Sequence, residues 1–356
     1  MSKNESLASN DLTEEESFED RIVFSDEVDD ERRDRLRKLQ DESRSMTQDD
    51  LSRNGYKQGL ISFSSTMEEH NYFLKTYHNL SKAKCFQYKN ELFRHRYVKE
   101  EEGVNYGIVG GVNTTIKEHP YMGALGYEVK EGKLDFFCGC TLISHHFALT
   151  AAHCSSKPVP GKLPLRPKIF RFGTTNITKR GQDYKILRVI NHPNYKSPSK
   201  YYDIALVETK SKIVFNEFVQ PACLWRNEDT SSLTHVSVSG WGVTDKYENL
   251  RKSDILQTAQ VDIVDKRMCK LLIDNKSRLS KTVEDHQICA GKLTGNIDSC
   301  KGDSGGPLEG FSDDTTFVFG VTSYGLHCAT RNTPSVYTKV STFVPWIENI
   351  VWRYIE

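Results

Sequence analysis

The chain has 356 residues, with 48 basic and 48 acidic side chains, so its formal net charge is zero. A zero balance argues against bulk binding of nucleic acid, and at roughly 100–200 residues per domain the length predicts two domains or one large domain with an extension. A mean hydropathy of −0.57 and the lack of an apolar run of about 18 residues argue against a transmembrane helix and a membrane partner.

Residues 1–84 are acidic, with 13 basic against 19 acidic side chains. Runs such as DLTEEESFED and DDERRDRLRKLQDESR contain few aromatic residues and no sustained apolar period. Such a segment buries too little apolar surface to offset the entropy of ordering it, so we expect a mostly disordered extension. One alternative is a lone charged helix over residues 28–44. Another, which rests on charge alone, is a separate module that binds a basic partner.

The beginning of the sequence and its cysteines give conflicting indications about secretion. The first thirty residues lack the basic start and the apolar stretch of a signal peptide. The nine cysteines, all from Cys85 onward and without a C-x-x-C pair, together with five N-x-S/T sequons, favour disulfides and the secretory pathway. We therefore expect an extracellular protein whose natural chain starts upstream of residue 1, or an incomplete gene prediction behind this sequence.

From Ile108 onward, short strand-like runs alternate with turn residues. Examples are FFCGCTLIS, FALTAAHC, DIALVETK, HVSVSGWG and FVFGVTSYG, separated by Gly, Pro, Asn and Asp. Many short strands with turn signals predict an all-β sandwich or barrel. The end of the chain predicts a helix that Ser341 or Thr342 caps, with Pro345 in its first turn.

Three segments carry residue types that suit nucleophilic catalysis: TAAHC with His153, DIAL with Asp203 and GDSGGP with Ser304. Each alone has an ordinary explanation as a structural histidine, a cap or a turn. Together they meet the needs of a serine nucleophile, which requires a base to remove its proton and a buried carboxylate to orient that base. The neighbouring glycines leave room for the N–H groups of Gly302 and Ser304 to point at a developing oxyanion.

These segments occur with GWG at 240–242, TSYG at 322–325 and PSVYTKV at 334–340 in the order typical of trypsin-like serine proteases, and IVGG at 108–111 opens the region. Residues 108–356 resemble that family, and HPNYKSPSKYYDIAL and PACLW are most similar to arthropod extracellular cascade proteases of the snake type. The resemblance implies two packed six-stranded antiparallel β-barrels with a C-terminal helix. It also implies hydrolysis of a protein or peptide substrate through an acyl-enzyme on Ser304, without metal or cofactor.

The resemblance assigns a specificity pocket as well. Asp298 would lie at the base of this pocket and select Lys or Arg before the cleaved bond. Ser323, Tyr324 and Gly325 would bind the substrate backbone as an added strand. Ser335 stands where relatives usually carry glycine, and its side chain would narrow the pocket.

The family resemblance further implies activation by cleavage before Ile108, whose new α-amino group would pair with Asp303. The residue before Ile108 is Gly107, however, where relatives typically carry Arg or Lys. Two functions therefore stand side by side. One is a protease zymogen cut by an activating protease of unusual specificity and controlled by protein inhibitors. The other is a protease-like zymogen that is never activated and acts as a binding or regulatory protein.

The family resemblance pairs eight of the nine cysteines. The implied disulfides are Cys138–Cys154, Cys269–Cys289, Cys300–Cys328 and Cys85–Cys223. The last pair makes residues 85–107 a tether between the extension and the peptidase domain at 108–356. Cys140 is left over, either as a buried apolar thiol or as one half of an intermolecular bridge.

Overall fold

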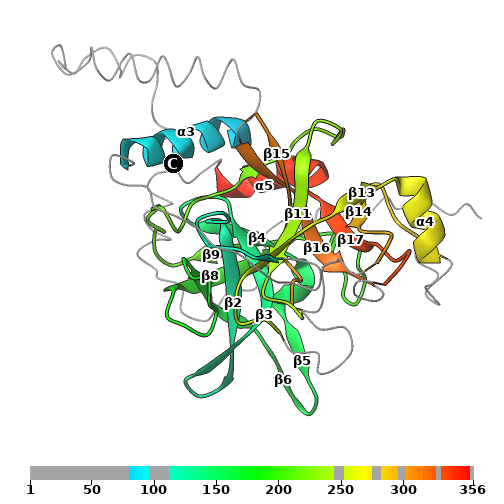
Figure 1. Ribbon diagram of the computed structural model, residues 1–356. Coiled ribbons are helices and arrows are strands. Elements are labelled where there is room, and N and C mark those ends of the chain that lie inside the picture. The colour runs from blue at the N-terminus through cyan, green and yellow to red at the C-terminus, as the bar shows by residue number, and fades with distance from the viewer. Residues whose placement is uncertain are drawn as a thin grey trace, which may run out of the picture.

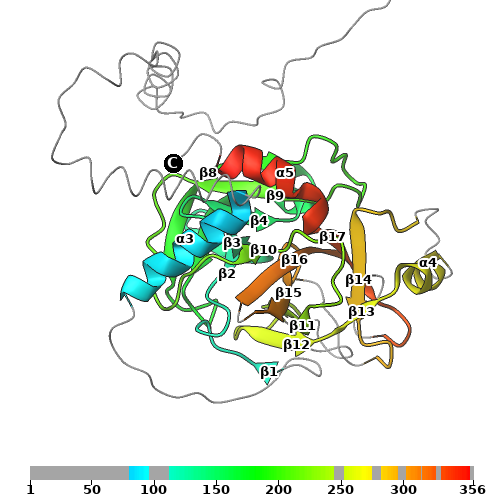
Figure 2. The ribbon, with the colours of Figure 1, turned by 90° about the horizontal axis from the view of Figure 1, so that it is seen from above.

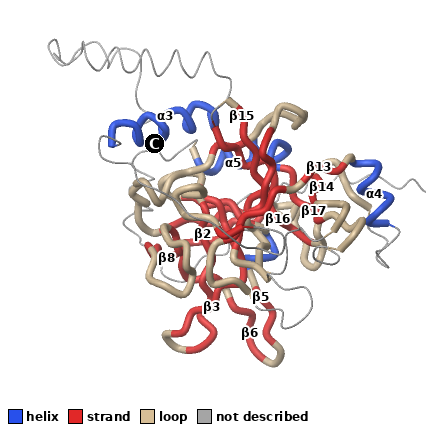
Figure 3. The backbone as a smooth tube through the Cα atoms, viewed as in Figure 1, coloured by secondary structure: helices blue, strands red, loops and turns tan. Residues whose placement is uncertain are grey.

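The computed structural model describes residues 80–95, 112–243, 252–274, 282–295, 302–313, 315–325 and 330–352. Strands dominate these residues (Figure 3) and form two β units, with one helix before them and one after them. Within the described ranges, no helix is both long and apolar enough to cross a membrane. The predicted disorder of residues 1–79 and the alternative helix over 28–44 lie outside the described residues.

The first unit is a closed antiparallel barrel of six strands (Figure 1), in the order β2–β3–β4–β9–β8–β7. The strands are β2 Met122–Lys130, β3 Lys133–Leu142, β4 Phe147–Thr150, β7 Pro167–Phe172, β8 Gln182–Asn191 and β9 Ala205–Thr209. Leu125, Phe147, Phe170 and Leu206 are fully buried inside it. Burial of side chains of this size contributes about 1.5–3 kcal/mol each, so this interior stabilises the barrel.

Two short elements leave the barrel between β4 and β7. The 3-10 helix η3 covers Ala152–Ser155, and a hairpin of β5 Lys157–Val159 and β6 Lys162–Leu165 follows it. Figure 1 shows this hairpin at the end of the molecule opposite the helix α3, which covers Leu80–His95.

The second unit is a nine-stranded sheet in the part of the chain described, ordered β1–β12–β11–β15–β16–β17–β14–β13 with β10 paired in parallel to β16. Its strands are β1 Val112–Asn113, β10 Cys223–Leu224, β11 Thr234–Gly240, β12 Gln257–Gln260, β13 Asp262–Val264, β14 Gln287–Gly291, β15 Pro307–Ser312, β16 Thr315–Tyr324 and β17 Ser335–Lys339. Val261 alone separates β12 from β13. The last strand of the sheet, β13, is therefore continuous in the chain with β12 near the other end, and the sheet curls round to bring them together.

This architecture confirms the predicted all-β fold with a C-terminal helix. The second unit differs from a plain six-stranded antiparallel barrel in carrying β1 and β10 as additional short strands. It also divides one stretch of chain into β12, which pairs with β11, and β13, which pairs with β14. A further helix, α4 Lys266–Asp274, lies between β13 and β14. The C-terminal helix α5 covers Val340–Val351.

The start of α5 differs from the prediction. Ser341 lies inside the helix and its Oγ atom donates to Glu228 at 3.2 Å, so it does not cap. Lys339 is the N-cap residue and makes no side-chain cap bond, and Pro345 lies past the first turn. The helix starts at Val340 because β17 ends directly before it, and the local capping signal does not include this constraint.

The helix α3 Leu80–His95 packs against α5 and β10 (Figure 2), and the Cys85–Cys223 disulfide ties it to the second unit. It begins at Leu80, so the structure corrects the expected boundary: residues 80–84 belong to a docked helix and not to a disordered extension. The backbone N–H of Ser81 donates to the Glu348 carboxylate at 2.8 Å. Composition alone missed this helix because the surface that orders it comes from distant segments.

Tyr88 connects α3 to the rest of the protein through aromatic contacts and a hydrogen bond. Its ring lies edge-on to His145 and Phe215, with centroid distances of 5.4 and 5.3 Å. The indole N–H of Trp352 donates to the Tyr88 hydroxyl at 3.0 Å. The aromatic contacts and the hydrogen bond together make Tyr88 part of the core.

We expect Tyr88→Ala to lower the free energy of unfolding by about 3–5 kcal/mol, because it leaves a cavity among packed rings. Urea unfolding followed by tryptophan fluorescence measures this change. Phe86→Ala on the same helix is the matched control, because Phe86 is 54% exposed and surface changes cost within about 0.5 kcal/mol. Equal effects of the two substitutions would contradict the docking of α3.

Candidate active site

The topology brings three segments together where the two β units face each other. Thr150 at the end of β4 pairs with Ala205 at the start of β9. The antiparallel register therefore places His153, which follows β4, beside Asp203, which precedes β9. In the second unit, Pro307 at the start of β15 pairs with Val321 near the end of β16, so Ser304 lies at the same edge.

The Asp203 carboxylate is completely buried and accepts hydrogen bonds from both units. His153 donates its backbone N–H to Oδ1 at 2.9 Å and its Nδ1 to Oδ2 at 2.7 Å. Ser323 donates its hydroxyl to Oδ2 from β16. Burial opposes the charge of Asp203, but the hydrogen bond and charge of His153, the charge of Lys200 and the hydrogen bond of Ser323 together outweigh it. The pKa of Asp203 therefore lies below its ordinary value.

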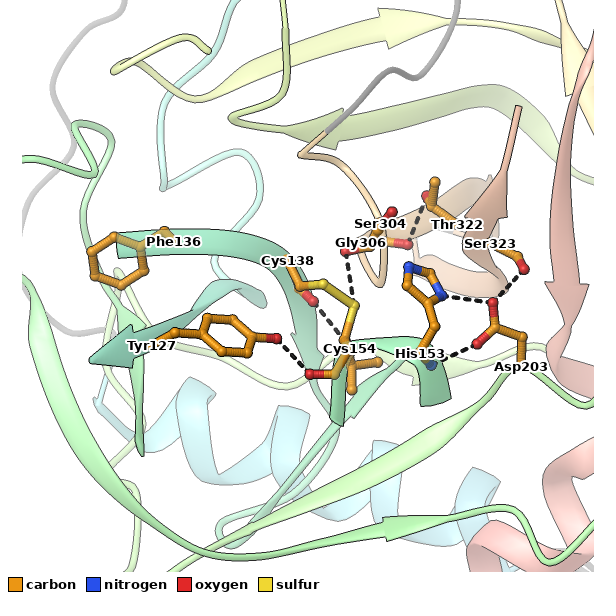
Figure 4. Close-up of a disulfide and its surroundings, with 12 residues drawn as sticks. Tyr127, Phe136, Cys138, His153, Cys154, Asp203, Ser304, Gly306, Thr322 and Ser323 are labelled. Atoms are coloured by element: carbon orange, nitrogen blue, oxygen red, sulfur yellow. Dashed lines mark hydrogen bonds and ion pairs between the residues drawn. A yellow bond between two sulfur atoms is a disulfide. The ribbon is translucent and has the colours of Figure 1, made fainter. Parts of the chain in front are cut away.

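The ionised state of Asp203 determines which nitrogen of the His153 ring carries the proton. A carboxylate can only accept, so the Nδ1 atom of the ring carries the proton of the 2.7 Å bond. In the neutral ring the other nitrogen, Nε2, is then a proton acceptor. Figure 4 shows the ring between Asp203 and Ser304. The arrangement can take a proton from a neighbouring hydroxyl.

The backbone around Ser304 is held tightly. The N–H of Gly139 on β3 donates to the Ser304 carbonyl at 2.8 Å, and the N–H of Gly305 donates to the Thr322 carbonyl at 2.8 Å. Gly305 has φ +81°, and a Cβ atom there would lie 2.2 Å from Thr150 Oγ1. Only glycine meets both conditions, so the turn after Ser304 depends on this residue.

The two residues before Ser304 lie against the GWG segment. Gly302 has φ +108°, and a Cβ atom there would lie 2.9 Å from the Cα atom of Gly242. The Asp303 carboxylate accepts the backbone N–H of Gly242 at 2.8 Å. Ile108, the predicted partner of Asp303, lies outside the described residues.

A disulfide joins Cys138 to Cys154 directly beside His153 (Figure 4). The Cys154 sulfur lies 3.8 Å from the Ser304 carbonyl oxygen; this is a packing contact, because a disulfide sulfur carries no proton to donate. Both cysteines and His153 place possible metal-binding atoms within 4.8 Å of one another. Because the two sulfurs are bonded to each other, they offer no thiolate to a metal.

The predicted pocket residues come together only in part. Ser323 and Tyr324 end β16, and Gly325 follows them. Ser335 on β17 is buried, and a Cβ atom on Gly325 would lie 2.8 Å from its Oγ atom. That Oγ atom has no hydrogen-bond partner among the described residues. Asp298, the predicted base of the pocket, lies outside them.

Two further disulfides lie in the described part of the chain, Cys85–Cys223 and Cys269–Cys289. The predicted pair Cys300–Cys328 lies outside the described residues. Cys140 is a free thiol with no exposed surface, and burial raises its pKa. It therefore matches the alternative of a buried apolar thiol and not that of an intermolecular bridge.

Comparison with known proteins defines the family: a profile described as Trypsin matches residues 108–347. The chain belongs to the trypsin family of serine proteases. It is 37% identical over 256 residues to Serine protease snk of Drosophila melanogaster, over 69% of this chain and 57% of that relative. It is 36% identical over 263 residues to Phenoloxidase-activating factor 3 of Holotrichia diomphalia, over 69% and 73% of the two chains.

A third relative is the Clotting factor G beta subunit of Tachypleus tridentatus, 33% identical over 253 residues, which cover 69% of this chain and 80% of the relative. These matches confirm the resemblance to trypsin-like serine proteases, with snk among the relatives. The match to snk spans little more than half of that relative's length.

Sequence reasoning missed a stack of three rings behind the Asp203 of this trypsin-family protease. The Tyr202 ring lies parallel to His192 and to His286, with centroid distances of 5.4 and 4.4 Å. His286 Nε2 accepts the backbone N–H of Tyr202 at 3.2 Å, which fixes the residue directly before Asp203. No motif marks His286, because it lies on a segment far from Asp203 in the sequence.

Burial, together with the charge of His286, lowers the pKa of His192 from 6.5 to about 4. Burial also lowers the pKa of His286, with Glu284 opposing and Lys266 adding to the effect. The folded protein therefore holds both rings neutral where the unfolded chain would protonate them.

We expect the melting temperature to fall between about pH 6.5 and about pH 4, because the unfolded chain binds protons there that the folded His192 does not. His192→Gln should flatten this fall, since it removes one proton-binding group of the unfolded chain. Thermal unfolding at a series of pH values measures it. His235→Gln changes an exposed histidine and should keep the wild-type slope. If the melting temperature fell equally with pH in wild type and His192→Gln, the result would refute the claim that the folded protein holds the His192 ring neutral.

Proposed function

We propose that the protein is an extracellular serine endopeptidase, made as a zymogen, that cleaves peptide bonds after Lys or Arg with Ser304, His153 and Asp203. The observation that carries this proposal is the buried, ionised Asp203 bonded to His153 Nδ1 at 2.7 Å, with the ring directed between it and Ser304. A solvated or purely structural histidine does not need a buried carboxylate of this kind.

The reaction follows from the positions of these groups. Ser304 Oγ attacks the peptide carbonyl while His153 Nε2 takes its proton, and Asp203 stabilises the imidazolium that forms. His153 then gives the proton to the leaving amine, and water repeats the sequence on the acyl-enzyme. The N–H groups of Gly302 and Ser304 would hold the oxyanion, and each such donor is worth roughly 10²–10³ in kcat.

Residues of the second β unit would recognise the substrate. Ser323, Tyr324 and Gly325 at the end of β16 offer backbone groups to an extended peptide. Asp298 would attract the basic side chain before the cleaved bond. The buried Ser335 hydroxyl, which has no described partner, supports a pocket narrower than one lined by glycine.

Activation would couple the chain end to Asp303. The amine of a free Ile108 would pair with the Asp303 carboxylate, which accepts the Gly242 N–H here, and so order the Gly302–Ser304 turn. Disulfides support an oxidising compartment. The names of two relatives, an activating factor and a clotting factor, support a place in a proteolytic cascade with an upstream protease and protein inhibitors.

Gly107 favours a second candidate, a protease-like zymogen that remains uncut and acts as a binding or regulatory protein. In that case the triad would be intact but never aligned for turnover. The state of the bond before Ile108 distinguishes the two candidates.

We expect a full-length variant in which residues 103–107 are replaced by Asp-Asp-Asp-Asp-Lys to become active when enteropeptidase frees Ile108. N-terminal sequencing checks the cut, and a fluorophosphonate probe with arginine and lysine peptide substrates checks the site. Asp203→Asn in the same background should lower kcat by roughly 10⁴-fold, because His153 then adopts the wrong tautomer.

Ser304→Ala should abolish turnover and labelling while the melting temperature stays near that of the parent. A folded protein with a free Ile108 that neither labels nor cleaves would refute the protease and favour the uncut binding protein. Turnover that survives Ser304→Ala would refute the nucleophile itself.

A further inference from the structure

Two lysine ammonium groups lie over one phenylalanine ring beside the candidate active site. The Nζ atom of Lys157 lies 3.0 Å from the centroid of the Phe137 ring, and that of Lys252 lies 4.6 Å from it. Lys157 begins β5 and Lys252 lies shortly before β12, so the two charges come from distant segments. An aromatic face attracts a cation without neutralising it, so positive charge is concentrated here.

This lysine pair borders the proposed nucleophile. Phe137 is followed by Cys138, one half of the disulfide that contacts the Ser304 carbonyl. A Cβ atom on Gly302 would lie 3.5 Å from the Cε atom of Lys252. The aliphatic part of Lys252 therefore passes the turn that leads into Ser304.

The lysine pair also lies on a defined side of Ser304. Figure 4 shows Phe136 and Ser323 on opposite sides of Ser304. The Nζ atom of Lys252 donates to the Phe136 carbonyl at 2.5 Å, so it belongs to the Phe136 side. Under the proposed function, Ser323 and the residues after it hold the acyl half of the substrate. An extended chain that crosses Ser304 then carries its leaving-group half over Phe136 and the lysine pair.

No direct ion pair neutralises the two lysines within the described residues. No carboxylate there forms an ion pair with either ammonium group. Burial lowers the pKa of Lys157 and the charge of Lys252 adds to this, with Asp135 opposing. Burial likewise lowers the pKa of Lys252, against the attraction of Asp135 and Asp303. An added carboxylate would therefore be bound favourably between the two lysines.

We propose that Lys157, Lys252 and the Phe137 ring form a subsite for an acidic side chain, Asp or Glu, within the first three residues after the cleaved bond. The carboxylate would lie between the two ammonium groups, with its aliphatic stem against the ring. This inference rests on the proposed function, because it assigns the lysines to the leaving-group half of the same substrate. The enzyme would then prefer an acidic residue after the cleaved bond in addition to a basic residue before it.

Acyl transfer tests the subsite separately from cleavage. The enteropeptidase-activated full-length variant is acylated with an arginine ester, and tripeptide amides then compete with water for the acyl group. Each amide carries Glu, Gln or Lys at its first, second or third position. We expect Glu to capture the acyl group about tenfold better than Gln at one of these positions, and Lys to be poorer than Gln.

Substitutions connect the preference to the two lysines. Lys157→Met and Lys252→Met should each reduce the Glu-to-Gln ratio several-fold, and Lys252→Glu should favour the Lys-containing amide. Labelling by a fluorophosphonate, which has no peptide leaving group, should stay within about twofold and so exclude a folding defect. The matched control is Lys162→Met on the same hairpin, which changes an exposed lysine and should keep the wild-type ratio.

The outcomes separate the two proposals. Absence of any acyl-enzyme would refute the proposed function and the subsite with it. An acyl-enzyme that accepts Glu, Gln and Lys amides equally would refute the subsite alone. A Glu preference that persists unchanged in both Lys→Met variants would also refute it.

Discussion

The buried carboxylate of Asp203 is the interaction on which the arrangement of the two β units depends. It accepts two hydrogen bonds from His153 in the first unit and one from Ser323 in the second. The backbone carbonyl of Asp203 accepts a hydrogen bond from the Thr338 hydroxyl on β17 at 2.8 Å. A buried charge is tolerated only when its partners are in place, so a displacement of either unit would leave it unsatisfied. The candidate site therefore also holds the two units together.

The position of Ser304 also depends on contacts between the two β units. Its carbonyl accepts the Gly139 N–H from the first unit, while Gly305 bonds to Thr322 in the second. The backbone of Ser304 and Gly305 is therefore bonded to both units. The Cys85–Cys223 disulfide and the Tyr88 contacts hold α3 in place. A cut before Ile108 would therefore leave α3 attached.

Under the two proposals, the charges around the candidate site would be arranged asymmetrically. A carboxylate at Asp298 would bind the substrate before the cleaved bond. The ammonium groups of Lys157 and Lys252 would bind it after that bond. Charges of opposite sign on either side of Ser304 fix the direction of an extended chain as well as its sequence.

The sequence by itself determined the strand-rich fold, the C-terminal helix and the membership of the trypsin family, because these depend on local patterns and on motifs in a fixed order. Tertiary structure alone decided the start of α5 at Val340, the docking of α3, and the partners of buried charged residues. Glu309, for example, is 2% exposed and bonds to His119 and Ser239 at 3.0 and 2.8 Å. Its burial is tolerated only because partners from distant strands surround it, and no local pattern encodes such contacts.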